Sequence, residues 1–228
     1  MLVTHAPNGV GEVFDPISTT KCNVTAQYPI PNYDSAGDVL EGIPIICGGF
    51  TSSEYIRDCY KYDLRQNKWV FLTKMNRTRS SHAVVVTDGG RLWITGGWVN
   101  GDGDWLQSTE FLSADGSITP GPNLPTGRSQ HCMVRLTDGR IMIIGGQTSN
   151  FRGEKKVTIY DLKSQSYTES VDTIFNREQH ACALFFSKMH NGRPVVAVIA
   201  SMYGQSVELL DYTTPGAIWE QSKNISFN

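Results

Sequence analysis

The chain has 228 residues, a formal net charge of −2 at pH 7 and 39% hydrophobic residues. This length suffices for one large core, and the charge excludes the broad basic surface typical of nucleic-acid or anionic-membrane binding. The longest apolar run, Val195–Ala200, is too short to span a bilayer. Met1–Val10 lacks the charged start and apolar stretch of a signal peptide. We therefore expect no nucleic-acid partner and no membrane insertion.

The predicted elements are short strands separated by glycine- and proline-rich turns, and no segment shows a sustained helical period. In chain order the strands are Met1–Thr4, Glu12–Asp15, Asn23–Tyr28, Asp38–Leu40, Ile43–Cys47, Cys59–Asp63, Trp69–Leu72, Ala83–Val86, Leu92–Thr95, Ser108–Leu112, Ile141–Ile144, Val157–Asp161, Val195–Ile199, Val207–Asp211 and Ile218–Trp219. The pattern predicts an all-β protein.

One stretch, Arg79–Gly97, contains features that return later in the chain. It combines Arg-x-x-His with two apolar strands around the turn Asp88-Gly89 and ends in a Gly-Gly pair. The same order begins again at Arg128 and, without the glycine pair, at Arg177. The three histidines are therefore 49 residues apart: His82, His131 and His180. A fixed period near 50 residues indicates a repeat architecture, and radially stacked four-stranded units form a β-propeller.

The order of these features resembles the kelch repeat. The best copies combine Gly48-Gly49 with Tyr62-Asp63 and Trp69, and Gly145-Gly146 with Tyr160-Asp161. The resemblance implies a kelch-type β-propeller of four-stranded antiparallel blades. We expect a single domain over 1–228 with about five blades, the first of them incomplete. Their approximate bounds are 1–35, 36–78, 79–127, 128–176 and 177–228. Each repeated histidine is expected to be a structural hydrogen-bonding group that ties a strand to a loop.

Closure of the ring leaves two alternatives. Met1–Thr4 takes the place of a second strand, so its inner neighbour has to come from elsewhere. Ile225 and Phe227 of the tail could supply that strand and close a five-bladed ring. Because the tail is short for an inner strand, we favour the alternative in which further blades or chains complete the ring.

The five cysteines leave at least one thiol without a partner inside the chain. Cys47 and Cys59 fall on adjacent strands of one blade, within reach of a disulfide, whereas Cys132 and Cys182 are expected to be buried thiols in inner strands. Three Asn-x-Ser/Thr sequons are candidate glycosylation sites: Asn23, Asn76 and Asn224. Together with the expected disulfide they favour an extracellular protein, and a cytoplasmic protein with free thiols is the alternative.

The sequence offers no catalytic constellation. Kelch-like propellers also include radical-copper oxidases of the galactose-oxidase and glyoxal-oxidase type, so the resemblance brings in an enzyme alternative. Their copper site needs a Tyr-His pair, which this chain lacks, and three of its five histidines belong to the repeat. Asp102 and Asp104 could contact a cation, but we interpret them as part of a solvated loop. We expect no catalytic residue, no metal site and no cofactor.

One face of the propeller is expected to carry recognition. The loops from strand two to strand three (50–57, 98–107 and 147–155) and the connections between blades open on the same side, which we call the loop face. Its candidate binding residues are Tyr55, Arg79, Trp98, Trp105, Arg128, Phe151, Arg152 and Arg177, residue types common at binding hot spots. In the alternative interpretation, the arginines pair with acidic neighbours and Trp98 packs on the next loop.

We therefore expect a non-catalytic scaffold that binds a protein or glycan partner through the loop face. A cytosolic substrate adaptor is the second interpretation, and the copper oxidase is the third. The sequence identifies no individual partner and leaves the pairing of Cys22, Cys132 and Cys182 open.

Overall fold

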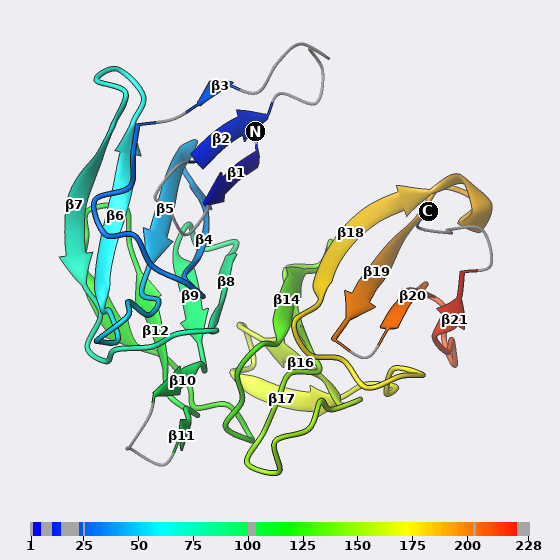
Figure 1. Ribbon diagram of the computed structural model, residues 1–228. Coiled ribbons are helices and arrows are strands. Elements are labelled where there is room, and N and C mark those ends of the chain that lie inside the picture. The colour runs from blue at the N-terminus through cyan, green and yellow to red at the C-terminus, as the bar shows by residue number, and fades with distance from the viewer. Residues whose placement is uncertain are drawn as a thin grey trace.

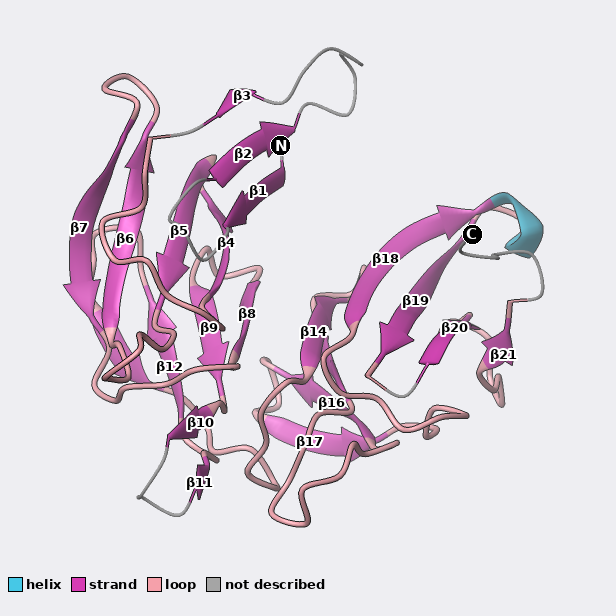
Figure 2. Cartoon of the chain, viewed as in Figure 1, coloured by secondary structure: helices cyan, strands magenta, loops and turns pink. Residues whose placement is uncertain are grey.

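The structure is a computed structural model that describes residues 2–5, 11–14, 23–24, 26–99, 104–202 and 204–222. Side chains are described from residue 26 onward, except that of Asp104. The described chain consists of strands and loops with one short helical turn, η1 (Lys188–His190) (Figure 2). The predicted all-β fold is confirmed.

Four antiparallel sheets of four strands each form complete blades, which we number two to five (Figure 1). They consist of β4 (Ala36–Leu40), β5 (Ile43–Cys47), β6 (Asp58–Asp63) and β7 (Lys68–Lys74); β8 (Ala83–Val86), β9 (Leu92–Thr95), β12 (Thr109–Leu112) and β13 (Ile118–Pro120); β14 (Cys132–Arg135), β15 (Ile141–Ile144), β16 (Val157–Asp161) and β17 (Ser166–Glu169); and β18 (Ala181–Ser187), β19 (Arg193–Ser201), β20 (Gly204–Leu210) and β21 (Glu220–Gln221). Each blade keeps its strands in sequence order.

Blade one has three described strands, β1 (Leu2–His5), β2 (Gly11–Phe14) and β3 (Asn23–Val24), in this spatial order. The first strands of blades two to five contact one another in the series β4, β8, β14 and β18. They therefore follow one another around a common axis, and the blades form an arc with β1–β3 at one end and β18–β21 at the other (Figure 1). This arrangement confirms a β-propeller of four-stranded antiparallel blades, four of which are complete among the described residues. The proposed pairing of Met1–Thr4 with Ile225 and Phe227 lies outside the described residues.

The core lies between the blades, because the second strands are apolar on both faces. Leu92 and Ile94 of β9 pack toward blade two, whereas Trp93 packs toward Ile141 and Ile143 of blade four. All five of these side chains are almost fully buried. A strand buried on both faces is a continuous apolar run rather than an alternating one, which explains why the sequence predicted β5, β9 and β15 with the bounds that the structure has. The second strand of blade five, β19, extends two residues beyond each end of the predicted Val195–Ile199.

Several elements differ from the expectation. Of the expected strand Asn23–Tyr28, only Asn23–Val24 is a strand among the described residues. The fourth strand of blade five is Glu220–Gln221 rather than Ile218-Trp219, because Trp219 is buried against blade four and its indole N–H donates to the Val171 carbonyl oxygen (2.9 Å). A two-stranded hairpin, β10 (Trp98–Val99) with β11 (Asp104–Trp105), was not predicted. Its strands are too short to show a period.

Candidate functional site

The Arg-x-x-His segment joins each blade to the one before it. The backbone carbonyl of Arg79 accepts a hydrogen bond from the N–H of Gly49 in blade two (2.9 Å), and Arg128 and Arg177 do the same for Gly97 (2.9 Å) and Gly146 (2.7 Å). Because the same backbone bond recurs at three successive blade junctions, the position of each connection at the loop face is fixed.

The arginine side chain returns to its own blade. Arg79 donates to the carbonyl of Gly96 (2.5 Å), Arg128 to that of Gly145 (2.8 Å) and Arg177 to that of Ala200 (2.6 Å). The three side chains are therefore buried, with residue exposures of 0%, 4% and 0%. The expectation that these arginines contact a partner directly is wrong, because their guanidinium groups are used to fasten the second strand of the blade.

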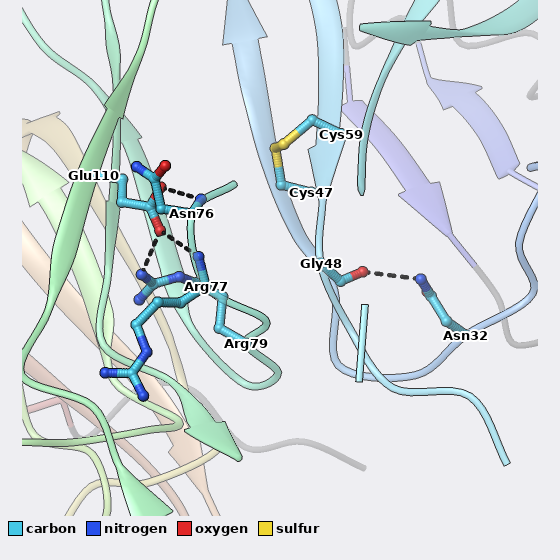
Figure 3. Close-up of a disulfide and its surroundings, with 8 residues drawn as sticks. All are labelled: Asn32, Cys47, Gly48, Cys59, Asn76, Arg77, Arg79 and Glu110. Carbon is cyan, nitrogen blue, oxygen red and sulfur yellow. Dashed lines mark hydrogen bonds and ion pairs between the residues drawn. A yellow bond between two sulfur atoms is a disulfide. The ribbon is translucent and has the colours of Figure 1, made fainter. Parts of the chain in front are cut away.

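Two of these arginines have a buried carboxylate partner. Arg79 pairs with Glu110 (2.8 Å) and Arg177 with Glu208 (2.5 Å). Glu110 also accepts hydrogen bonds from the backbone N–H groups of Asn76 and Arg77 (Figure 3). Desolvation lowers the pKa of Arg79, and the hydrogen bond and charge of Glu110 oppose that shift. In blades three and five the arginines therefore pair with acidic neighbours, as the alternative interpretation of the sequence expected.

Close approach explains the glycine pairs. A Cβ atom on Gly96 would lie 2.4 Å from the carbonyl oxygen of Arg128, and one on Gly145 would lie 2.5 Å from that of Arg177. Both glycines also have a positive φ, 59° and 58°. These positions accept only glycine without a shift of the next blade.

The repeated histidines lie below the loop face near the central axis. His131 hydrogen bonds through Nε2 to the Thr95 hydroxyl at the end of β9 (2.8 Å), which confirms a strand-to-loop role for that histidine. Burial lowers the pKa of His82 to about 3, that of His180 to about 4 and that of His131 well below its usual value, and the repeat arginines add to each shift. The three rings are therefore neutral at physiological pH.

A row of polar residues surrounds the mouth of the central channel on the loop face. Asp34, Ser81, Gln130 and Gln179 all have φ between 50° and 57°. The N–H of each later residue donates to the carbonyl of the one before it, at 2.8, 2.7 and 3.1 Å. We call these four residues the polar arc. Together with the repeat histidines, they line a cavity of about 440 Å³.

A row of aromatic side chains crosses the same face. Phe50 contacts Tyr55 (ring centroids 4.8 Å apart), Tyr55 contacts Trp98 (5.6 Å), and Trp105 contacts Phe151 (4.7 Å). Trp98 and Trp105 are paired across the β10–β11 hairpin, which joins the two groups into one row. We call these five residues the aromatic ridge. A cavity of about 230 Å³ separates Trp98, Trp105 and Phe151 from the polar arc.

A model of the kelch motif matches residues 45–76, which span β5 to the end of blade two. Kelch-like protein 15 of zebrafish (Danio rerio) is 26% identical to this chain, in an alignment that covers 62% of this chain and 27% of the zebrafish protein. Kelch-like protein 15 of mouse (Mus musculus) is also 26% identical, in an alignment that covers 67% of this chain and 28% of the mouse protein. The chain thus spans little more than a quarter of these relatives. A solved structure described as "Structure of YjhT" superposes with a TM-score of 0.71 at 15% identity, over 88% of this chain and 67% of the other.

The chain has a kelch-type β-propeller fold, contains a kelch motif in blade two and is similar to kelch-like proteins. The match to the motif lies in blade two, where the glycine pair, Tyr62 and Trp69 all occur. The internal repeat extends the kelch pattern through blades three and four and, without the glycine pair, into blade five.

The kelch fold brings four of the predicted binding residues together. Tyr55, Trp98 and Trp105 are half-buried in the aromatic ridge, and Phe151 is 69% exposed at its end. Arg152 is exposed next to Phe151. Trp98 packs on Tyr55 of the preceding blade, whereas the alternative interpretation expected it to pack on the next loop. Asp102 and the side chain of Asp104 lie outside the described residues.

The polar arc was missed in the sequence, although its signal is present there. Ser81, Gln130 and Gln179 each stand immediately before a repeated histidine, at the same spacing of 49 residues. A position that varies between serine and glutamine looks like a linker in the kelch pattern, so its placement at the channel mouth became clear only from the fold.

Two disulfides are present among the described residues. Cys47 and Cys59 are paired across β5 and β6 of blade two, as predicted (Figure 3). Cys132 and Cys182 are also paired, so the expectation that they are separate buried thiols is wrong. Their inner strands are neighbours around the axis, with Cα atoms 6.1 Å apart, a distance that a disulfide spans. Cys22 lies outside the described residues.

Of the three sequons, only Asn76 has a described side chain, and it is exposed. The side chain of Asn23 and all of Asn224 lie outside the described residues. Within the described ranges, no helix is long and apolar enough to cross a bilayer, and no three acidic, histidine or cysteine side chains form a metal-binding group.

Proposed function

We propose that this kelch propeller is a non-catalytic scaffold that binds a protein partner through its loop face. The observation that carries this proposal is the pairing of the aromatic ridge with the polar arc around two adjoining cavities. Aromatic side chains supply large contact areas at low entropic cost, and polar groups beside them fix the orientation of a ligand.

Unpaired polar atoms also support binding at the loop face. Three buried polar atoms have no hydrogen-bond partner among the described residues: Trp105 Nε1, Gln130 Oε1 and His131 Nδ1. All three residues line the two cavities. Buried polar groups are nearly always hydrogen bonded. A bound partner that supplies an acceptor and a donor would satisfy these atoms, whereas a purely structural surface gains nothing from leaving them unpaired.

The test is affinity capture with variants on opposite faces. A partner captured by the native protein is purified, and its dissociation constant is measured for Phe151→Ala and for Leu64→Ala. Leu64 is an exposed side chain in the β6–β7 turn on the opposite face, so it is the matched control. We expect Phe151→Ala to weaken binding by at least about tenfold, as for a hot-spot aromatic residue. Equal affinities for both variants, or a loss confined to Leu64→Ala, would contradict the proposal.

We also propose that the protein works in an oxidising compartment outside the cytosol, with Asn76 carrying a glycan. Two disulfides and one exposed sequon support this placement. Mass spectrometry of native material with and without reductant tests it. Four cysteines protected from alkylation and a glycan on Asn76 are expected. Five reactive thiols and no glycan would instead indicate a cytosolic adaptor.

A further inference from the structure

The described walls of the loop-face cavities carry negative charge and no positive charge. Among the described residues that line them, Asp34 is the only charged side chain. Its carboxylate is exposed and accepts one hydrogen bond, from the Ser81 hydroxyl (3.0 Å). No described lysine or arginine lies within ion-pair distance of it. The guanidinium groups of Arg79 and Arg177 lie inside the blades, where glutamates neutralise them. That of Arg128 is also buried, donates to the Gly145 carbonyl and makes no ion pair among the described residues.

The remaining groups around Asp34 include serine and glutamine side chains, two unpaired acceptor atoms and three aromatic residues. Gln130 Oε1 is buried and unpaired, and His131 Nδ1 has no partner on a residue only 6% exposed. Asp34 and Gln130 line both cavities, and the smaller cavity also touches Trp98, Trp105 and Phe151. A carboxylate, an amide oxygen and aromatic rings within one cavity form the set of groups that binds an ammonium or guanidinium group.

We propose that the loop face binds a basic side chain, lysine or arginine, that a protein partner inserts between Asp34 and the aromatic ridge. The charged group pairs with the Asp34 carboxylate and donates to Gln130 Oε1, while the aliphatic stem of the side chain lies along Trp105 and Phe151. This inference rests on the proposed function and specifies the chemistry that the partner must present.

The direct test uses small probes rather than an unknown partner. Nα-acetyl-arginine amide and Nα-acetyl-lysine amide are titrated into ¹⁵N-labelled protein, and the indole resonances of Trp98 and Trp105 are followed. Nα-acetyl-citrulline amide and Nα-acetyl-norleucine amide are the neutral controls. We expect a saturable shift for the cations, with millimolar affinity as is usual for one isolated side chain, and no saturation for the neutral probes.

Matched variants decide which groups bind the cation. Asp34→Asn should raise the dissociation constant of the arginine probe at least about tenfold, because it removes a charge-assisted hydrogen bond, and Gln130→Met should raise it a few-fold. Asp88→Asn, in the β8–β9 turn on the opposite face, should leave it unchanged. The indole spectrum without probe shows whether each variant is folded.

The inference is overturned by equal shifts for arginine and citrulline, by a preference for an acetyl-glutamate amide, or by unchanged affinity in folded Asp34→Asn and Gln130→Met. Absence of any saturable shift up to about 50 mM probe also contradicts it. These outcomes differ from failure of the proposed function, which would appear as a partner that binds Phe151→Ala and the native protein equally well.

Discussion

The repeat arginine is the residue that connects most of the structure. Its carbonyl oxygen binds the glycine pair of the preceding blade, and its guanidinium binds the second strand of its own blade. One residue therefore fixes both sides of a blade junction. Because the side chain is buried at all three positions, its repetition reflects architecture rather than recognition.

Alanine at Gly96 should be strongly destabilising. The added Cβ would meet the Arg128 carbonyl oxygen at 2.4 Å in a backbone with φ of 59°. Gly90 is the matched control, because its φ is 65° but nothing lies within 4 Å of the added Cβ. We expect Gly90→Ala to cost about 1–2 kcal/mol, the strain of a left-handed residue alone. Gly96→Ala should cost at least about 3 kcal/mol of unfolding free energy in urea denaturation. Equal losses would show that the close approach between blades does not determine the glycine.

Removing one member of the buried ion pair in blade five should be costly as well. Glu208→Gln leaves Arg177 buried without a compensating charge, and we expect a loss of about 3–5 kcal/mol. Thr158 occupies the corresponding position in blade four, where Arg128 makes no ion pair among the described residues. Thr158→Val should therefore cost under about 1 kcal/mol. Comparable losses at the two positions in urea melts would contradict the role assigned to the carboxylate.

The buried histidines predict acid sensitivity. Each is held neutral in the folded state and regains an ordinary pKa when the chain unfolds, so below pH 6.5 the unfolded state binds more protons. Stability is then highest above pH 6.5 and falls toward pH 4, by about 1.4 kcal/mol per pH unit for each histidine that stays neutral. Urea melts between pH 7 and 4.5 measure this slope. His131→Gln should lower it, whereas His190→Gln, outside the repeat, should not. A flat profile over this range would show that the histidines are not buried as neutral groups.

The blades consist of paired strands, and most of these strands can be predicted from the sequence. Apolar runs such as Leu92–Thr95 and Ile141–Ile144 have no alternative to burial between two blades, so their bounds were predicted correctly. The hairpin β10–β11 was not predictable in this way, because it is held by backbone pairing and the aromatic ridge rather than by a period. The ridge itself depends on contacts between residues of three blades, which no local pattern reports.

The two disulfides act on different elements, and this difference is measurable. Cys47–Cys59 closes a short segment inside one blade, with a separation of 12, whereas Cys132–Cys182 joins blades four and five across a separation of 50. Loop-closure entropy predicts a stabilisation of about 3 kcal/mol for the shorter loop and about 4 kcal/mol for the longer one.

The paired variants Cys47→Ser with Cys59→Ser, and Cys132→Ser with Cys182→Ser, separate these effects in thermal melts. The inter-blade pair should show the larger loss of melting temperature. It should also show faster hydrogen exchange in β18. A larger loss for the intra-blade pair would contradict this assignment.

At the scale of the molecule, architecture and recognition use different residues of the same repeat. The arginine, glycine and histidine positions are buried and build the blades, while the residue before each histidine and the long loops form the loop face. The sequence predicted Tyr55, Trp98, Trp105 and Phe151 from residue type and loop position. It could not separate them from the arginines, because each buried guanidinium binds a carbonyl group 17 to 23 residues later in the chain, as between Arg128 and Gly145.

Hydrogen exchange of the protein with and without its captured partner tests the central claim most directly. Binding through the loop face predicts slower exchange in peptides that contain Tyr55, Trp105 and Phe151 and in those that contain Ser81 and Gln130. The opposite-face turns at Gly42, Asn67 and Gly90 should exchange at unchanged rates. Protection confined to those turns, or to the outer strands β7, β13 and β17, would contradict recognition through the loop face.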